Sequence, residues 1–200
     1  MTYLEIGVQF GYSLRLALSE TYVIGVDPNP LCGVPAHLQG VIIQSTSDEY
    51  FEGDVRAPDM TFIDGMHLIE YALRDFINAE TTSNPDGIIL LDDVLPYSWD
   101  IAGREPLPGD WAGDVWKIWP ILTVWRPDLR IVAIDVEPTG LLAIWRLDPA
   151  STRLHISYDK IVEAWIENAE RDQRIINRTD AISPEQALQL ITEEKAAFQA

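Results

Sequence analysis

The chain has 200 residues, of which 47% are hydrophobic and 23% charged, a composition typical of one folded domain rather than a disordered tail. Its 32 acidic and 14 basic residues give a formal net charge of -18, so its field repels nucleic acid and anionic lipid surfaces, and we expect neither as a partner. One cysteine, Cys32, excludes an internal disulfide, and the lack of a membrane-length apolar run or a signal-peptide pattern favours a cytoplasmic location.

Short apolar runs rich in β-branched residues alternate with segments of helical period, which is the pattern of βαβ units. Strands are predicted at residues 3–8, 22–27, 41–44, 60–64 and 87–92, and helices at 13–19 and 67–81. Prolines and glycines then break any regular element for about twenty residues, which indicates a long functional loop. A helix at 114–125 precedes strands at 130–136 and 141–147, whose tight Pro/Gly turn predicts an antiparallel hairpin. Helices are predicted at 158–176 and 184–198.

The first predicted strand leads into a glycine-rich turn and a helix start. A Cβ at Gly7 or Gly11 would collide with a nucleoside, so the two glycines let it lie against bare backbone. The second strand ends at Asp27, twenty positions after Gly7, where a carboxylate can accept hydrogen bonds from both ribose hydroxyls. The sequence therefore predicts a nucleoside site at the carboxyl ends of the strands; the alternative is a turn with a purely structural role.

The spacing and charge around the turn indicate which nucleoside fits. A dinucleotide-binding loop has the pattern G-x-G-x-x-G and directs a helix N-terminus at a pyrophosphate. Here the turn follows G-x-x-x-G-x-S from Gly7 through Gly11 to Ser13, and Glu5 precedes it. A carboxylate at that place opposes a pyrophosphate and suits a cationic ligand. The predicted cofactor is S-adenosylmethionine, which carries a sulfonium, an amino group and no phosphate.

Several segments resemble the class I S-adenosylmethionine-dependent methyltransferases. They are Leu4-Glu5-Ile6-Gly7 with Gly11 and Ser13, Val26-Asp27, Phe62-Ile63-Asp64-Gly65-Met66-His67, and Leu90-Leu91-Asp92-Asp93-Val94. With Gly113-Asp114-Val115-Trp116-Lys117, they look like the metal-dependent small-molecule O-methyltransferases of the cephalosporin-hydroxylase and macrolide-sugar methyltransferase group. The resemblance covers residues 3–147 and implies an α/β fold: a Rossmann-like, mostly parallel seven-stranded sheet with helices on both faces and a terminal antiparallel hairpin.

The domain organisation follows from these elements. We expect residues 1–148 to form the methyltransferase-like domain and residues 149–200 a helical extension, packed on the same domain or on a partner subunit. In the family that the chain resembles, helices before the first strand cover the cofactor site. Here the C-terminal helices or a neighbouring subunit of a homo-oligomer are expected to cover it; the alternative is an incomplete or relaxed pocket.

Three carboxylates follow the fourth and fifth strands. Asp64 ends one strand and Asp92 and Asp93 end the next, so in a parallel sheet they meet at one edge. Converging carboxylates repel one another unless a cation lies between them, and oxygen ligands without sulfur favour Mg²⁺, with Mn²⁺ or Ca²⁺ as alternatives. The plainer interpretation is that these aspartates cap helices or turns.

Further residues are candidates for the chemistry. His67 lies three positions after Asp64, the offset at which the catechol-type relatives carry a lysine base, and an imidazole can accept the acceptor's proton at neutral pH. Lys117 is either a second proton acceptor or a salt-bridge partner. Ser45 and Thr46 follow the third strand, where this fold meets the adenine, and Asp64 is assigned to the cofactor as well as to the metal. Of five tryptophans between the fifth strand and the hairpin, Trp99 and Trp111 are predicted substrate neighbours.

The function predicted from the sequence is a Mg²⁺-assisted, S-adenosylmethionine-dependent O-methyltransferase that acts on a hydroxylated small molecule. A non-catalytic relative that binds a ligand or a partner through the same sheet is a second hypothesis. A nicotinamide-linked oxidoreductase is a third, which the glycine spacing and Glu5 disfavour.

Overall fold

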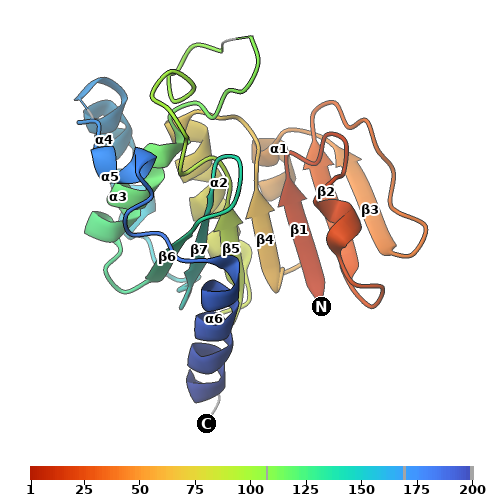
Figure 1. The fold of residues 1–200 in the computed structure, drawn as a ribbon. Helices are drawn as coiled ribbons and strands as arrows, with labels where there is room; N and C mark the ends of the chain where they lie inside the picture. The colour runs from red at the N-terminus through yellow and green to blue at the C-terminus, as the bar shows by residue number, and fades with distance from the viewer. Residues whose placement is uncertain (107, 169, 199–200) are drawn as a thin grey trace.

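The computed structural model describes residues 1–106, 108–168 and 170–198, and its seven strands form one sheet in the order β3-β2-β1-β4-β5-β7-β6 (Figure 1). The strands are β1 (Thr2–Ile6), β2 (Tyr22–Asp27), β3 (Gln39–Gln44), β4 (Met60–Ile63), β5 (Ile88–Leu91), β6 (Arg130–Ile134) and β7 (Leu141–Trp145). Strands β1 to β5 pair in parallel, and β7 runs antiparallel to both β5 and β6. The predicted mostly parallel sheet with a terminal antiparallel hairpin is confirmed.

Helices cover both faces of the sheet, as predicted. They are α1 (Ser47–Phe51), α2 (Ile69–Thr82), α3 (Ile118–Trp125), α4 (Arg153–Asn168), α5 (Gln173–Ile176) and α6 (Pro184–Phe198), with short 3-10 turns η1 (Leu14–Leu16) and η2 (Val115–Lys117). On one face α2, α3 and α4 enclose the largest core cluster, which contains Phe76, Ile121 and Leu142. On the other face α6 packs Ala187 near Trp145 of β7.

Three elements differ from the sequence-based expectation. The helix expected at 13–19 is a single turn, because only Leu14 is buried whereas Leu16 and Leu18 are exposed. The short helix α1 was not predicted, although Thr46 and Glu49 form a capping box at its start. The helix expected at 158–176 begins earlier, at Arg153, and its last turn belongs to the separate helix α5.

The topology directs the carboxyl ends of β1, β2 and β4 toward one edge of the sheet. In Figure 1 this edge lies at the top, and the chain between β5 and α3 loops above it, whereas α6 extends from the opposite end. Of the C-terminal helices, α6 therefore lies away from this edge. Within the described ranges, no helix combines the length and the apolar character that a membrane crossing requires.

Candidate active site

The turn after β1 packs directly against the end of β4. Gly7 has φ +87°, donates its N–H to the Val26 carbonyl at 2.8 Å, and lies so close to β4 that an added Cβ would stand 1.8 Å from the Asp64 carbonyl oxygen. Only glycine fits this backbone conformation and this approach. The packing of the turn against β4 therefore requires glycine at position 7 even without a ligand. The sequence argument had attributed this glycine to a bound nucleoside.

Three predicted cofactor contacts lie together on the far side of the turn. Glu5 is buried and accepts hydrogen bonds from Tyr3 Oη at 2.8 Å and Ser13 Oγ at 2.6 Å. Burial raises the pKa of the Glu5 carboxyl, and the two hydroxyls partly oppose this rise. An added Cβ at Gly11 would stand 3.0 Å from Cys32 Sγ. The structure brings Glu5, Gly11 and Ser13 together, but none of the three lines the neighbouring cavity described next.

A cavity of about 540 Å³ opens at the carboxyl ends of β1 to β4, within the usual size range of small-molecule sites. It is lined by Ile6, Gly7, Gln9, Val26, Asp27, Pro28, Asn29, Ser45, Thr46, Ser47, Asp48, Asp64, Gly65, Met66, His67, Tyr71 and Asp75. Five predicted cofactor residues are among them: Gly7, Asp27, Ser45, Thr46 and Asp64. No described residue after Asp75 contributes to this lining, so the C-terminal helices do not cover it.

Asp27 organises the middle of this cavity. Its Oδ2 accepts the N–H of Gln9 at 2.9 Å and its Oδ1 accepts the N–H of Asn29 at 2.7 Å. Each carboxylate oxygen has a second lone pair, so ribose hydroxyls can still bind there. Thr46 is committed differently, because its side chain accepts the N–H of Glu49 at 3.2 Å to cap α1.

An acidic cluster with a histidine lies at the end of the cavity beyond β4. His67 Nε2 is 3.5 Å from Asp64 Oδ1, and His67 Nδ1 is 2.8 Å from Asp93 Oδ2. These three residues each place one potential metal-ligand atom within 4.8 Å of the others. Asp92 is not in this group; its Oδ1 accepts the N–H of Asp93 at 2.8 Å, within its own turn. The sequence argument placed Asp92 in the metal site, whereas the geometry places His67 there.

The two carboxylates control the charge of the imidazole. Burial lowers the pKa of His67, but the hydrogen bonds and charges of Asp64 and Asp93 outweigh this effect and raise it to about 11. The carbonyl oxygen of Trp111, 2.8 Å from Nδ1, also requires a proton on that atom, because a carbonyl only accepts. Without another cation, His67 is therefore the positive charge that joins the two aspartates.

Burial also changes the carboxyl groups beside this cluster. Burial, with the charges of Asp64 and Asp93, raises the pKa of Asp92 to about 7. Burial raises the pKa of Asp64 as well, with Asp93 adding to the rise and His67 opposing it. The site therefore contains more carboxylate than its single imidazolium neutralises, which favours a cation.

The loop between β5 and α3 forms one wall of the site. Trp111 stacks on the His67 ring, with ring centroids 5.3 Å apart and an interplanar angle of 14°. Gly113 packs so closely that an added Cβ would stand 1.6 Å from the His67 carbonyl oxygen. Trp111 is therefore a site neighbour, as expected, whereas Trp99 lies elsewhere and packs edge-on against Trp116 at 5.1 Å.

Lys117 belongs to a buried ion-pair network that anchors this loop. Its Nζ lies 2.8 Å from Asp114 Oδ2, which also binds Arg104 at 2.9 Å, and Asp114 Oδ1 accepts the N–H of Ile69 at the start of α2. Arg104 in turn forms two bonds with Glu70. Of the two roles considered for Lys117, the geometry favours the salt bridge.

One lining residue, Asp75, has no place in the sequence argument. It lies on α2 in the same stripe as Ala72 and Ala79, and all three are buried. Its Oδ1 has no hydrogen-bond partner among the described residues, and the same is true of Ser45 Oγ. The signal in the sequence was an acidic residue on the apolar stripe of an amphipathic helix, where a charge needs a partner.

Comparisons with known proteins support one fold. Residues 4–94 match the family model described as "Methyltransferase domain". Cofactor-bound Rv0187 from MTB has a TM-score of 0.56 and 18% identity, covering 74% of this chain and 73% of that chain. The O-methyltransferase from Bacillus cereus in complex with SAH has a TM-score of 0.52 and 16% identity, covering 72% and 73%. MycE from the mycinamycin biosynthetic pathway, in complex with Mg, SAH and mycinamycin VI, has a TM-score of 0.50 and 18% identity, covering 75% and 46%. No curated protein sequence matches the chain.

Proposed function

We propose that the chain is a class I, S-adenosylmethionine-dependent methyltransferase that methylates a hydroxyl of a small molecule with the help of a divalent metal ion; the match of residues 4–94 to the methyltransferase domain model and the shared fold support this proposal. One observation carries the proposal. A single cavity reaches from Asp27 to Asp64 and His67, and the last two also belong to the cluster that could hold a metal. This continuity supports a donor site and a metal site that adjoin each other.

The lining of the cavity fits S-adenosylmethionine better than a nucleotide with a pyrophosphate. Its described lining residues include Asp27, Asp48, Asp64 and Asp75 and no lysine or arginine. This negative field attracts a sulfonium and an ammonium and repels phosphate. The buried Ser45 Oγ and Asp75 Oδ1, which lack partners among the residues that the structure describes, are the kind of groups that a bound ligand satisfies. The same charges argue against a nicotinamide dinucleotide.

The acidic cluster fits a divalent metal by the same reasoning. Asp64, His67 and Asp93 would hold it, and two carboxylates suit Mg²⁺ or Mn²⁺. A bound metal ion lowers the pKa of a hydroxyl that coordinates it and so makes the oxygen a better nucleophile. While His67 holds the metal through one ring nitrogen it does not act as a base, because its Nδ1 keeps a proton toward the Trp111 carbonyl. Trp111 covers one face of the imidazole and shields it from water on that side.

Calorimetry tests the donor site. S-adenosylhomocysteine should bind the wild-type protein and bind Asp27→Ala much more weakly, because that change removes the ribose acceptor and the support for Gln9. Asp86→Ala is the matched control, since Asp86 is exposed and precedes β5 at the opposite edge of the sheet. An absence of heat with wild-type protein at millimolar ligand contradicts the proposal.

Turnover tests the metal. S-adenosylhomocysteine production with a panel of hydroxylated aromatic and sugar acceptors should require Mg²⁺ or Mn²⁺, stop with a chelator, and be lost in Asp64→Ala but kept in Asp86→Ala. Methylation that continues unchanged in the chelator refutes the role given to the metal and leaves the cofactor site standing.

A further inference from the structure

Asp75 is the lining residue that the proposed function has not used. Its side chain is 3% exposed and faces the cavity from α2. An added Cβ at Gly65 would stand 3.5 Å from Asp75 Oδ2, so the carboxyl group lies under the loop that follows β4. Its Oδ1 has no partner within the part of the chain that the structure describes. Folded proteins seldom leave such a group unpaired unless a ligand or water pairs with it.

The surroundings of Asp75 place it at the end of the cavity beside α1. Arg74 forms two bonds of 2.6 Å with Asp48, which fixes α2 against α1 next to Asp75. Burial raises the pKa of the Asp75 carboxyl to about 7; Asp48 adds to this rise, and Ser47 and Arg74 oppose it. In the order of the strands, Asp27 at the end of β2 lies between Ser45, which follows β3, and Asp64, which follows β4 and belongs to the acidic cluster. A nucleoside whose ribose binds Asp27 and whose methyl donor points to Asp64 therefore directs its base toward Asp75.

We propose that Asp75 reads the base of the cofactor: its unpaired Oδ1 accepts a hydrogen bond from the exocyclic amino group of adenine. Ser45 Oγ, the second unpaired group in the lining, pairs with a ring nitrogen of the same base. A 6-oxo purine presents an oxygen where adenine presents the amino group, and two acceptors facing each other repel. This inference rests on the proposed cofactor, and it assigns to a helix residue the selectivity of the cavity for an adenine nucleoside.

The test uses two ligands that differ only at this position: S-adenosylhomocysteine and its deaminated analogue, S-inosylhomocysteine. Calorimetry is performed well above the raised pKa of Asp75, so that the carboxyl is ionised. The wild-type protein should prefer the adenosyl ligand by about tenfold or more, because the analogue leaves buried acceptors unpaired. Asp75→Asn keeps the shape of the side chain and can turn either its oxygen or its amide N–H toward the base. The preference should then fall to about threefold or less.

Each outcome decides the matter. Equal binding of both ligands to the wild-type protein overturns the role of Asp75 and leaves the cofactor site intact. An equal loss of both ligands in Asp75→Asn, with the wild-type preference retained, shows a structural role only and also overturns it. Failure of both ligands to bind the wild-type protein removes the proposed function together with this inference. Asp86→Asn serves as the control for a surface carboxylate, and thermal melting checks that each variant is folded.

Discussion

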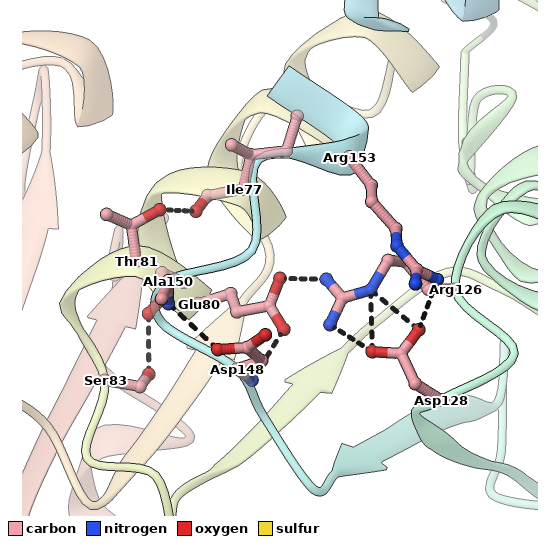
Figure 2. Close-up of polar contacts among 10 residues, drawn as sticks. Ile77, Glu80, Thr81, Ser83, Arg126, Asp128, Asp148, Ala150 and Arg153 are labelled. Atoms are coloured by element: carbon pink, nitrogen blue, oxygen red, sulfur yellow. Dashed lines mark hydrogen bonds and ion pairs between the residues drawn. The ribbon is translucent and has the colours of Figure 1, made fainter. Parts of the chain in front are cut away.

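The sharpest prediction about stability concerns Arg126, which anchors the C-terminal end of α2. Its guanidinium is fully buried, pairs with Glu80 of α2, and forms bonds of 2.8 to 3.1 Å with Asp128 (Figure 2). Arg126→Met keeps most of the aliphatic volume but leaves Glu80 as a buried carboxylate without a cation. Breaking a buried pair in this way costs about 3 to 5 kcal/mol. Because Glu80 keeps the Asp148 N–H at 3.1 Å, we expect the lower end, about 3 kcal/mol.

Urea unfolding followed by tryptophan fluorescence measures this loss, and in a chain of this length the melting temperature should fall by about 6 to 12 °C. The double variant Arg126→Met/Glu80→Gln should recover about 2 kcal/mol of unfolding free energy. Residue 80 then carries no unpaired charge, while its side-chain oxygen still accepts the Asp148 N–H. Arg153→Met is the matched control: Arg153 also reaches Asp128, at 3.5 Å, but its side chain is 63% exposed, so its loss should cost less than about 0.5 kcal/mol. A cost below about 1 kcal/mol for Arg126→Met, or strictly additive single effects, refutes the reasoning.

Three further predictions concern the site. The folded-state pKa of Asp75, about 7, lies above its ordinary value of 3.8, so the wild-type protein loses stability as the pH rises between these values. In urea unfolding, the stability of Asp75→Asn relative to wild type should therefore increase by up to about 4 kcal/mol from about pH 4 to about pH 8. A stability difference that does not change with pH contradicts this. Asp93→Asn should weaken Mn²⁺ binding, measured by electron paramagnetic resonance, by about tenfold or more, and Asp92→Asn by clearly less; equal losses argue for the carboxylate triad instead. Gly7→Ala should destabilise the fold by more than about 3 kcal/mol in thermal melts, whereas Gly33→Ala, with no atom within 4 Å of the added Cβ, should be nearly neutral.

Much of the fold is predictable because local pattern and topology agree. Buried apolar runs bounded by turn residues predicted each strand to within two residues, and the Glu137-Pro138-Thr139-Gly140 turn between two such runs required the antiparallel hairpin. The single 3-10 turn at Leu14–Leu16 differs because a helical period in the sequence does not guarantee an apolar face to pack against. Tertiary packing decides the length of such weak helices.

The composition of the acidic cluster illustrates what a sequence leaves open. Parallel topology brings the ends of β4 and β5 together, so Asp64 and Asp93 were predictable neighbours. Successive residues at a strand end point in opposite directions, and Asp93 also adopts φ +64°, so Asp93 and not Asp92 places an oxygen within 4.8 Å of the Asp64 and His67 ligand atoms. His67 takes that place because the turn after Asp64 folds back toward β5. The orientation of single side chains at a turn depends on such local dihedral angles, which spacing does not specify.

The contact of Gly7 with the Asp64 peptide links the two halves of the site mechanically. With no space between them, a donor molecule that displaces the glycine turn also displaces the Asp64 backbone and with it the carboxylate on the same residue. Thermodynamic reciprocity then requires that an ion held by that carboxylate alter donor affinity by the same factor. Under the proposed function, the cooperativity between ion and donor therefore passes through the contact of one glycine.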